Sequence, residues 1–251
     1  MRNLAITIRF VGTNYHGFQV QQNAMTVCEA FQNAAQQVLG ERGELKGCSR
    51  TDSGVHANRY ILSLKTSSTI DCRGFVFAMN TKLPDDIAVL DCREADPDFH
   101  ARYSCKGKRY LYKIYNSRLP DPFLEHRAYR CPVSLDAQLM NEAAKCFIGT
   151  HDFSAFCALD NYNRDKSKVR TIFDCSVRRD GEVITISVTG DGFLYNMVRI
   201  LCGTLVHVSR GKIPLEDLPA IIQEGDRTKS GPTLPPQGLY LDDIFYDQII
   251  I

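Results

Sequence analysis

The chain has 251 residues, of which 44% are hydrophobic and 24% are charged, and its 30 basic and 29 acidic residues leave a net charge of +1. These values exclude a disordered chain and a histone-like polycation, and the length allows one large or two modest domains. The sequence contains no apolar run of membrane-spanning length, and residues 1–10 are charged too early for a secretory signal. We therefore expect a cytoplasmic protein.

The first half of the chain alternates strand and helix patterns. Thr26 followed by Glu29 forms a capping box, which predicts the start of a helix that ends near Gly40. Hydrophobic periodicity predicts the order β-α-β-β-α-β, with strands at Leu4–Val11, Leu45–Arg50, Asn58–Lys65 and Ile87–Arg93, and helices at Thr26–Gly40 and Arg73–Thr81.

The second half repeats this order. Ser134 is the expected cap of a helix that ends near Phe147, and Asp180-Gly181 predicts a hairpin turn. The other predicted elements are strands at Cys105–Tyr115, Val169–Arg179, Glu182–Thr189 and Gly238–Phe245, and helices at Phe193–Ser209 and Leu215–Gln223.

This repetition predicts an α+β fold of two duplicated β-α-β-β-α-β halves, residues 1–104 and 105–251. Their antiparallel sheets are expected to form a central sheet with helices packed on one face. A cleft between two such halves is the expected place for an active site.

A polar segment between two predicted strands is the first candidate site. Residues 48–57 read Cys-Ser-Arg-Thr-Asp-Ser-Gly-Val-His-Ala and contain Arg50, Asp52 and Gly54. A carboxylate can act as nucleophile or base, and glycine lets the backbone approach a ligand closely. The alternative interpretation is a solvated turn, because Asp, Ser and Gly are common turn formers.

The predicted helix Phe193–Ser209 is apolar on nearly every side, and Arg199 is its only formally charged residue. A buried guanidinium without a partner costs several kcal/mol, so a carboxylate or phosphate is expected to face it. Alternatively, the side chain reaches solvent at the edge of the helix.

The strand Cys105–Tyr115 interleaves cationic and aromatic side chains, with Lys108 and Tyr110 on one face. Such a mixture suits phosphates and unpaired bases, but it is also common on a charged edge strand. The basic loop at 163–170 is by itself typical of a solvated segment. The ten cysteines contain no C-x-x-C pair, so they favour core packing and no metal site.

Together these segments resemble the tRNA pseudouridine synthase A family over nearly the whole chain. The segments that carry the resemblance are Phe10–Gln21, Arg50–Ala57, Phe99–Arg102 followed by Lys108–Tyr110, Val169–Ile172, Met197–Arg199 and Pro236–Leu241, in the family's order. The chain departs from the family's pattern at Phe18, where tryptophan is usual, and at Cys48-Ser49, which replaces a glycine.

The resemblance implies an enzyme that isomerises uridine to pseudouridine at positions 38, 39 and 40 in the anticodon arm of tRNA. It implies Asp52 as the nucleophile, Tyr110 packed on the target base, Arg199 paired with the aspartate, and Arg50 holding the displaced nucleotide or its phosphate. It also implies a homodimer that uses no metal, nucleotide or redox cofactor.

Three alternatives stay open at this point. The fold can serve as an RNA-binding module without catalysis, or a paralogue can act on another RNA target. A hydrolase that uses Asp52 with His56 as an acid–base pair is the third, although it leaves the basic and aromatic strand without a role.

Overall fold

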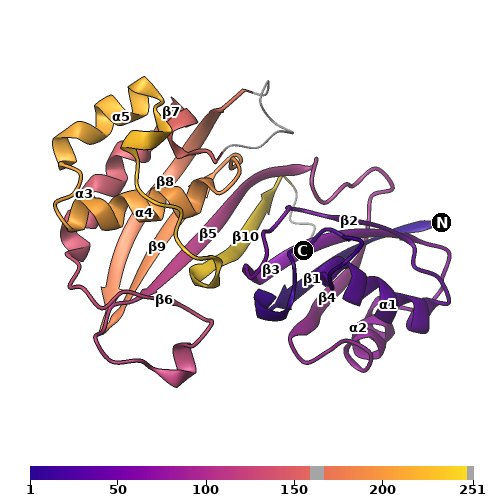
Figure 1. The fold of residues 1–251 in the computed structure, drawn as a ribbon. Coiled ribbons are helices and arrows are strands. Elements are labelled where there is room, and N and C mark those ends of the chain that lie inside the picture. Colours follow the sequence, from indigo (N-terminus) through magenta and orange to yellow (C-terminus); the bar gives the residue numbers. More distant parts are fainter. Residues whose placement is uncertain (159–166, 248–251) are drawn as a thin grey trace. The chain divides into compact units, whose positions relative to one another are not determined.

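The computed structural model describes residues 1–158 and 167–247. The chain divides into two compact units, which we call the first unit (Met1–Lys106 with Tyr240–Ile251) and the second unit (Gly107–Leu239). Each unit combines helices with a mixed, mostly antiparallel arrangement of strands, so the chain is α+β (Figure 1). The predicted α+β class is thus confirmed, but the prediction of antiparallel sheets is only partly right, because two of the strand pairings are parallel.

The first unit has the predicted element order. Its elements are β1 (Arg2–Phe10), α1 (Val27–Leu39), β2 (Glu44–Gly47), β3 (His56–Thr66), α2 (Cys72–Asn80), β4 (Ile87–Ala95) and, from the end of the chain, β10 (Leu239–Tyr246). The strands are ordered β4-β1-β3-β10, and β2 also pairs with β3. Thr26 caps α1 by accepting the backbone N–H of Glu29, as the capping box predicts.

Strand β1 runs through the core of the first unit. Successive side chains of a strand point to opposite faces. Leu4, Ile6 and Ile8 on one face are fully buried, and Ala5 on the other face is buried as well. The segment after β4 is tied to this second face, because Ala101 donates its N–H to the Ser63 hydroxyl beside Ala5. Both faces of the central strands are therefore covered within one unit.

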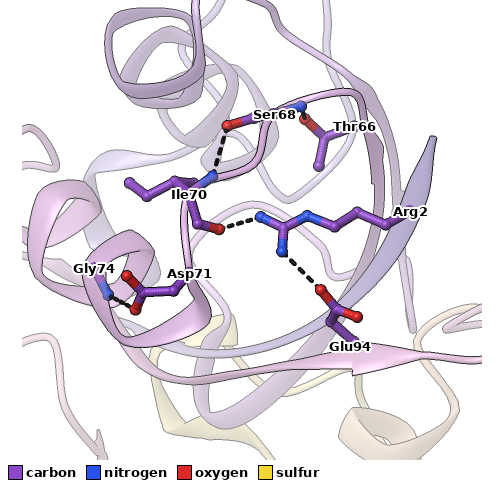
Figure 2. A network of polar contacts seen from close by, with 7 residues as sticks. All are labelled: Arg2, Thr66, Ser68, Ile70, Asp71, Gly74 and Glu94. Carbon is purple, nitrogen blue, oxygen red and sulfur yellow. Dashed lines mark hydrogen bonds and ion pairs between the residues drawn. The ribbon is translucent and has the colours of Figure 1, made fainter.

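A polar network fixes the start of α2 to the strands (Figure 2). Asp71 caps the helix by accepting the N–H of Gly74 at 2.8 Å. Arg2 on β1 donates to the carbonyl of Ile70 and, at 2.7 Å, to Glu94 on β4. One guanidinium thus ties the segment before α2 to both β1 and β4.

The second unit contains three α-helices and five strands among its described residues. They are β5 (Cys105–Tyr115, which begins in the first unit), β6 (Tyr129–Arg130), α3 (Ala137–Ala144), β7 (Gly149–Asp152), β8 (Val169–Asp180), β9 (Val183–Gly190), α4 (Met197–Ser209) and α5 (Leu218–Glu224). The strand order is β5-β9-β8-β7, and β6 pairs with β5. The predicted hairpin is confirmed, because Asp180 pairs with Val183 and Gly181 has φ +56° in the two-residue turn.

Two predicted helix starts are wrong. Asp136, not Ser134, caps α3, because its carboxylate accepts two backbone N–H groups at 2.9 and 3.0 Å. Helix α4 begins at Met197 rather than at Phe193, because Asn196 has a left-handed backbone (φ +58°) that an α-helix cannot include. From Met197 to Ser209 this helix is largely buried, as its composition predicts.

The last strand joins the first unit rather than the half in which the sequence order places it. Tyr240 and Leu241 of β10 pair in parallel with His56 and Ala57, at the beginning of β3. The sequence predicts the strand itself, but no local pattern shows its partner. This pairing places the beginning of β10 next to His56, directly after the loop that carries Asp52.

Candidate active site

The loop that carries Asp52 connects β2 to β3 in the first unit. Cys48 and Val55, near the two ends of the loop, are buried. Between them Asp52 is half-buried and Arg50 is exposed. The segment is therefore not simply a solvated turn, because both of its ends are buried in the core.

A second segment, residues 15–18, is hydrogen-bonded to the Asp52 loop on both sides of the aspartate. Just before Asp52, the carbonyl of Thr51 accepts the N–H of Phe18 at 3.2 Å. Just after it, the carbonyl of Tyr15 accepts the N–H of Gly54 at 3.2 Å and the hydroxyl of Ser53 at 3.3 Å. We call these three hydrogen bonds the loop clamp.

Two glycines allow the clamp to form. Gly17 has φ +79°, and a Cβ added there would lie 2.4 Å from the carbonyl oxygen of Thr51. Gly12 lies so close to the loop that an added Cβ would be 1.9 Å from the carbonyl oxygen of Val55. Both distances are far below van der Waals contact, so only glycine lets the two backbones approach this closely.

His56 closes the far end of the loop. Its side chain is 1% exposed, its Nδ1 accepts the N–H of Gly12 at 3.0 Å, and its ring lies 4.7 Å from that of Tyr240. Because Nδ1 accepts a backbone N–H, this nitrogen carries no proton in this arrangement. The buried ring therefore has a structural task, which weighs against the hydrolase that would use His56 as an acid–base partner.

Phe18 and Cys48, which depart from the family's pattern, are both buried and packed in the core. Phe18 is buried and stacks on Tyr60, with ring centroids 4.6 Å apart and an interplanar angle of 24°. Cys48 is fully buried, and its N–H donates to the carbonyl of Ile61 at 3.0 Å. The Tyr60 hydroxyl also donates to the carbonyl of Ser49, so the start of the loop is held by the core.

Tyr110 lies on β5 in the second unit. It is 7% exposed and contacts Phe193 edge-to-face, with ring centroids 5.1 Å apart. Its neighbour on the same face, Tyr112, is fully buried and donates its hydroxyl to the carbonyl of Pro235 at 2.7 Å. The aromatic side chains on this face of the strand are thus mainly buried in the core, and Tyr110 is the one nearest to Lys106 and Lys108.

Arg199 lies in the first turn of α4 and is half-buried. Its Nε donates to the carbonyl of Leu234 at 2.6 Å, and its Nη1 donates to Oδ1 of Asn196 at 2.6 Å. These bonds offset part of the desolvation of the guanidinium with neutral acceptors inside the same unit. Burial raises the pKa of the nearby Tyr112 above its ordinary value, and the charge of Arg199 offsets only part of this rise.

The predicted site residues therefore fall into two sets. Arg50 and Asp52 share a loop in the first unit, and Tyr110 and Arg199 lie in the second unit. Sequence reasoning did not assign roles to Phe193 and Leu234, which contact Tyr110 and Arg199. Neither belongs to a charged or polar pattern, so nothing in the local sequence marks them.

The basic residues near β5 differ in their surroundings. Lys106 is exposed and forms an ion pair with Asp247 at 2.8 Å, and this contact raises the pKa of the lysine. Lys108 is half-buried and pairs with Gly190 in the β5–β9 ladder. Residues 163–166 of the predicted basic loop lie outside the described residues.

Within residues 1–158 and 167–247, no three His, Cys, Asp or Glu side chains lie close enough together to hold a metal ion. No helix in the same part of the chain is both long and apolar enough to cross a membrane. Burial raises the pKa of the Cys28 thiol to about 11 and that of Cys175 to about 12.

Comparisons with known proteins agree with the resemblance read from the motifs. A family model described as tRNA pseudouridine synthase matches residues 6–104 and 143–247. The tRNA pseudouridine synthase A of Acetivibrio thermocellus is 47% identical over 246 residues, which cover 98% of this chain and 100% of that protein.

The chain belongs to the tRNA pseudouridine synthase A family. The family's proteins from Thermoanaerobacter sp. (strain X514) and Ruminiclostridium cellulolyticum are 44% and 46% identical, and each match covers 98% of this chain and 100% of the relative. Among solved structures, a Cbf5-Nop10-Gar1 complex matches with a TM-score of 0.38 and 12% identity, over 81% of this chain and 44% of that one. That likeness is too low to support a statement about fold or function. The family model spans the segments that form the loop clamp.

Proposed function

We propose that the protein isomerises uridine to pseudouridine at positions 38, 39 and 40 in the anticodon stem and loop of tRNA, with Asp52 as its nucleophile. The loop clamp is the observation that carries this proposal. Two motifs of a tRNA pseudouridine synthase, far apart in sequence, are hydrogen-bonded to each other on both sides of one half-buried aspartate. A loop held in this way suits a catalytic carboxylate, which must keep a fixed position.

The reaction needs few protein groups. The bond between C1′ of the ribose and N1 of uracil breaks, the base turns, and C1′ joins C5. C5 loses a proton and N1 gains one, so atoms and charge balance without an oxidant or a co-substrate. An aspartate can attack C1′ or C6, or it can remove the C5 proton. The target atoms are shielded in a stacked arm, so the base must also be flipped out.

The other roles come to this chain through the resemblance. We assign Arg199 as the cation that pairs with Asp52 and keeps it ionised, because a nearby guanidinium lowers the pKa of a carboxyl group. Tyr110 packs on the flipped base, and Arg50 holds the displaced nucleotide or its phosphate. We further propose that both halves, residues 1–104 and 105–251, contribute residues to one active site.

The partners follow from the same proposal. The enzyme binds the anticodon arm of tRNA, acts in the cytoplasm as a homodimer, and needs no metal, nucleotide or redox cofactor. Its near-neutral net charge is compatible with this partner, because RNA binding depends on where basic residues gather rather than on their sum.

Release of tritium tests the activity directly. In tRNA that carries [5-³H]uridine, each isomerisation releases the C5 hydrogen to water. We expect the wild-type enzyme to release tritium, and Asp52→Asn to bind tRNA with unchanged affinity but to release none. The matched control is Asp98→Asn, because Asp98 is an exposed aspartate on another loop of the same unit. Residual turnover of Asp52→Asn within about tenfold of wild type would remove Asp52 as the nucleophile, since loss of a nucleophile typically costs far more.

The same assay separates the alternatives. Tight tRNA binding without tritium release by the wild-type protein would identify an RNA-binding module without catalysis. Release from another RNA but not from tRNA would identify a paralogue with a different target. Mapping pseudouridine in tRNA from cells that lack the protein then identifies the modified positions.

A further inference from the structure

The loop clamp depends on residues 15–18, which form no strand or helix of their own. The far side of this segment is bound to the start of α1. The carbonyls of Gly17 and Phe18 accept the N–H groups of Val27 and Cys28, at 3.2 and 3.1 Å. These bonds hold the end of the segment that contacts Thr51. At the other end, where the carbonyl of Tyr15 contacts the residues after Asp52, the N–H groups of Tyr15 and His16 donate to the carbonyls of Gly12 and Met25, both at 3.0 Å.

The side chain of Tyr15 adds a further anchor at this end, to a distant segment of the unit. The ring is 5% exposed, and its hydroxyl donates a hydrogen bond to Oδ1 of Asp86, just before β4. The second carboxylate oxygen, Oδ2, accepts the side-chain amide of Asn14 at 3.0 Å. The backbone carbonyl of Asp86 also accepts the N–H of Val11 at 2.8 Å. One aspartate thus makes three contacts to the segment 11–15.

These contacts form a continuous path from β4 to the nucleophile. The Asp86 carboxylate holds the phenol of Tyr15, and the carbonyl of the same tyrosine binds Ser53 and Gly54, the two residues that follow Asp52. A hydrogen bond to an ionised acceptor is roughly twice as strong as a neutral one. The path is therefore suited to keep the loop from shifting.

We propose that Asp86 and Tyr15 are positioning residues for the reaction, which act on Asp52 through the backbone of the loop. The inference rests on the proposed role of Asp52 as the nucleophile. Neither residue is assigned a contact with the substrate. Loss of the hydrogen bond between Tyr15 and Asp86 is expected to slow the chemical step and to leave tRNA binding unchanged. A misplaced catalytic group lowers the rate of reaction rather than the affinity.

The raised pKa of Tyr15 agrees with this arrangement. The pKa of Tyr15 lies well above its ordinary value, first because the ring is buried and then because its hydroxyl donates to Asp86. The phenol is therefore protonated, and is a hydrogen-bond donor, throughout the pH range in which the enzyme can be assayed.

The test is a double-mutant cycle on Tyr15→Phe and Asp86→Ala, measured as the single-turnover rate of tritium release from [5-³H]uridine tRNA bound beforehand. We expect each single variant to lower that rate about tenfold, the double variant to lose no more than either single, and tRNA affinity to stay within about twofold. Asp86→Asn keeps an acceptor for the phenol, so its rate should lie between those of Asp86→Ala and wild type. Asp85→Ala, at the neighbouring exposed carboxylate, is the matched control with the wild-type rate.

The possible results are distinct. Wild-type rates in folded Tyr15→Phe and Asp86→Asn would overturn the proposal, and so would a double variant whose loss is the product of the two single losses. Weaker tRNA binding at an unchanged single-turnover rate would also overturn it, because the segment would then be an RNA contact. If Asp86→Ala does not fold, as judged by circular dichroism, Tyr15→Phe and Asp86→Asn carry the test. Absence of tritium release by the wild-type enzyme would instead refute the proposed function itself.

Discussion

Replacement of Gly17 by alanine is the sharpest perturbation of the loop clamp. Gly17 has φ +79°, and an alanine Cβ would lie 2.4 Å from the carbonyl oxygen of Thr51, about 1 Å short of the 3.4 Å at which ordinary contact begins. The left-handed backbone costs an alanine roughly 1–2 kcal/mol. Relief of the overlap by a backbone shift adds about 1–3 kcal/mol, the usual cost of overpacking.

Gly40 offers a matched control in the same unit. It has nearly the same backbone, φ +75°, and no described atom lies within 4 Å of an added Cβ. Gly40→Ala therefore incurs only the conformational cost of about 1–2 kcal/mol. The difference between the two variants isolates the steric overlap at Thr51, next to the proposed nucleophile.

Denaturant unfolding followed by circular dichroism measures the stability difference, and tritium release measures turnover. We expect Gly17→Ala to be less stable than wild type by roughly 2–5 kcal/mol and to turn over about a hundredfold more slowly, since a displacement near 1 Å can cost that much. Gly40→Ala should keep the wild-type turnover. Equal stability of the two variants, together with wild-type turnover in Gly17→Ala, would refute the argument that this glycine positions the loop.

Three further predictions address single side chains. Arg199→Ala should lose turnover, and it should lose about 1.5–3 kcal/mol of stability for each hydrogen bond made by the charged group. Arg199→Lys should keep more stability but little turnover. Wild-type turnover in either variant would contradict the proposed role of Arg199. Tyr110→Ala should impair turnover far more than tRNA affinity, with Tyr110→Leu as a control for packing. Lys108→Ala should instead weaken tRNA binding and flatten its salt dependence. An equal loss of affinity in Tyr110→Ala and Lys108→Ala would show that the strand is an electrostatic surface only. A hydrogen bond from Thr66, together with two from Ser67, lowers the pKa of Glu41 below its ordinary 4.5, so this carboxylate stabilises the fold above that pH. The stability difference between wild type and Glu41→Gln should therefore vanish as pH falls through the lowered value, and a difference that persists at low pH would rule out this origin.

Several features of this protein were determined by the sequence alone because they depend on neighbours along the chain. The helix cap at Thr26, the hairpin turn at Gly181 and the buried character of α4 each follow from a local pattern that the structure confirms. Caps, turns and periodic faces involve residues within one or two turns of each other, so their signals survive in a short window of sequence.

The position of Asp52 was predicted only as a loop between strands. The motifs predict which residues carry chemistry, and the chain belongs to the family that these motifs resemble. The clamp around the aspartate could not be derived, because it joins residues more than thirty positions apart, and two of its three hydrogen bonds run between backbone groups. Nearly every residue type carries a backbone carbonyl and N–H (proline lacks the N–H), so these groups leave no mark in the sequence.

Only the tertiary structure decided where the longer-range contacts lie. The pairing of β10 with β3, the start of α4 at Met197 and the bond between Tyr15 and Asp86 each depend on segments that are distant in the chain. At Asn196 the backbone turns left-handed where local helix propensity favours continuation, because the preceding residues make contacts elsewhere: Phe193 packs on Tyr110, and the carbonyl of Tyr195 accepts the N–H of Ala158. Tertiary contacts outweigh a local preference of less than about 1 kcal/mol per residue, and a single sequence records only the preference.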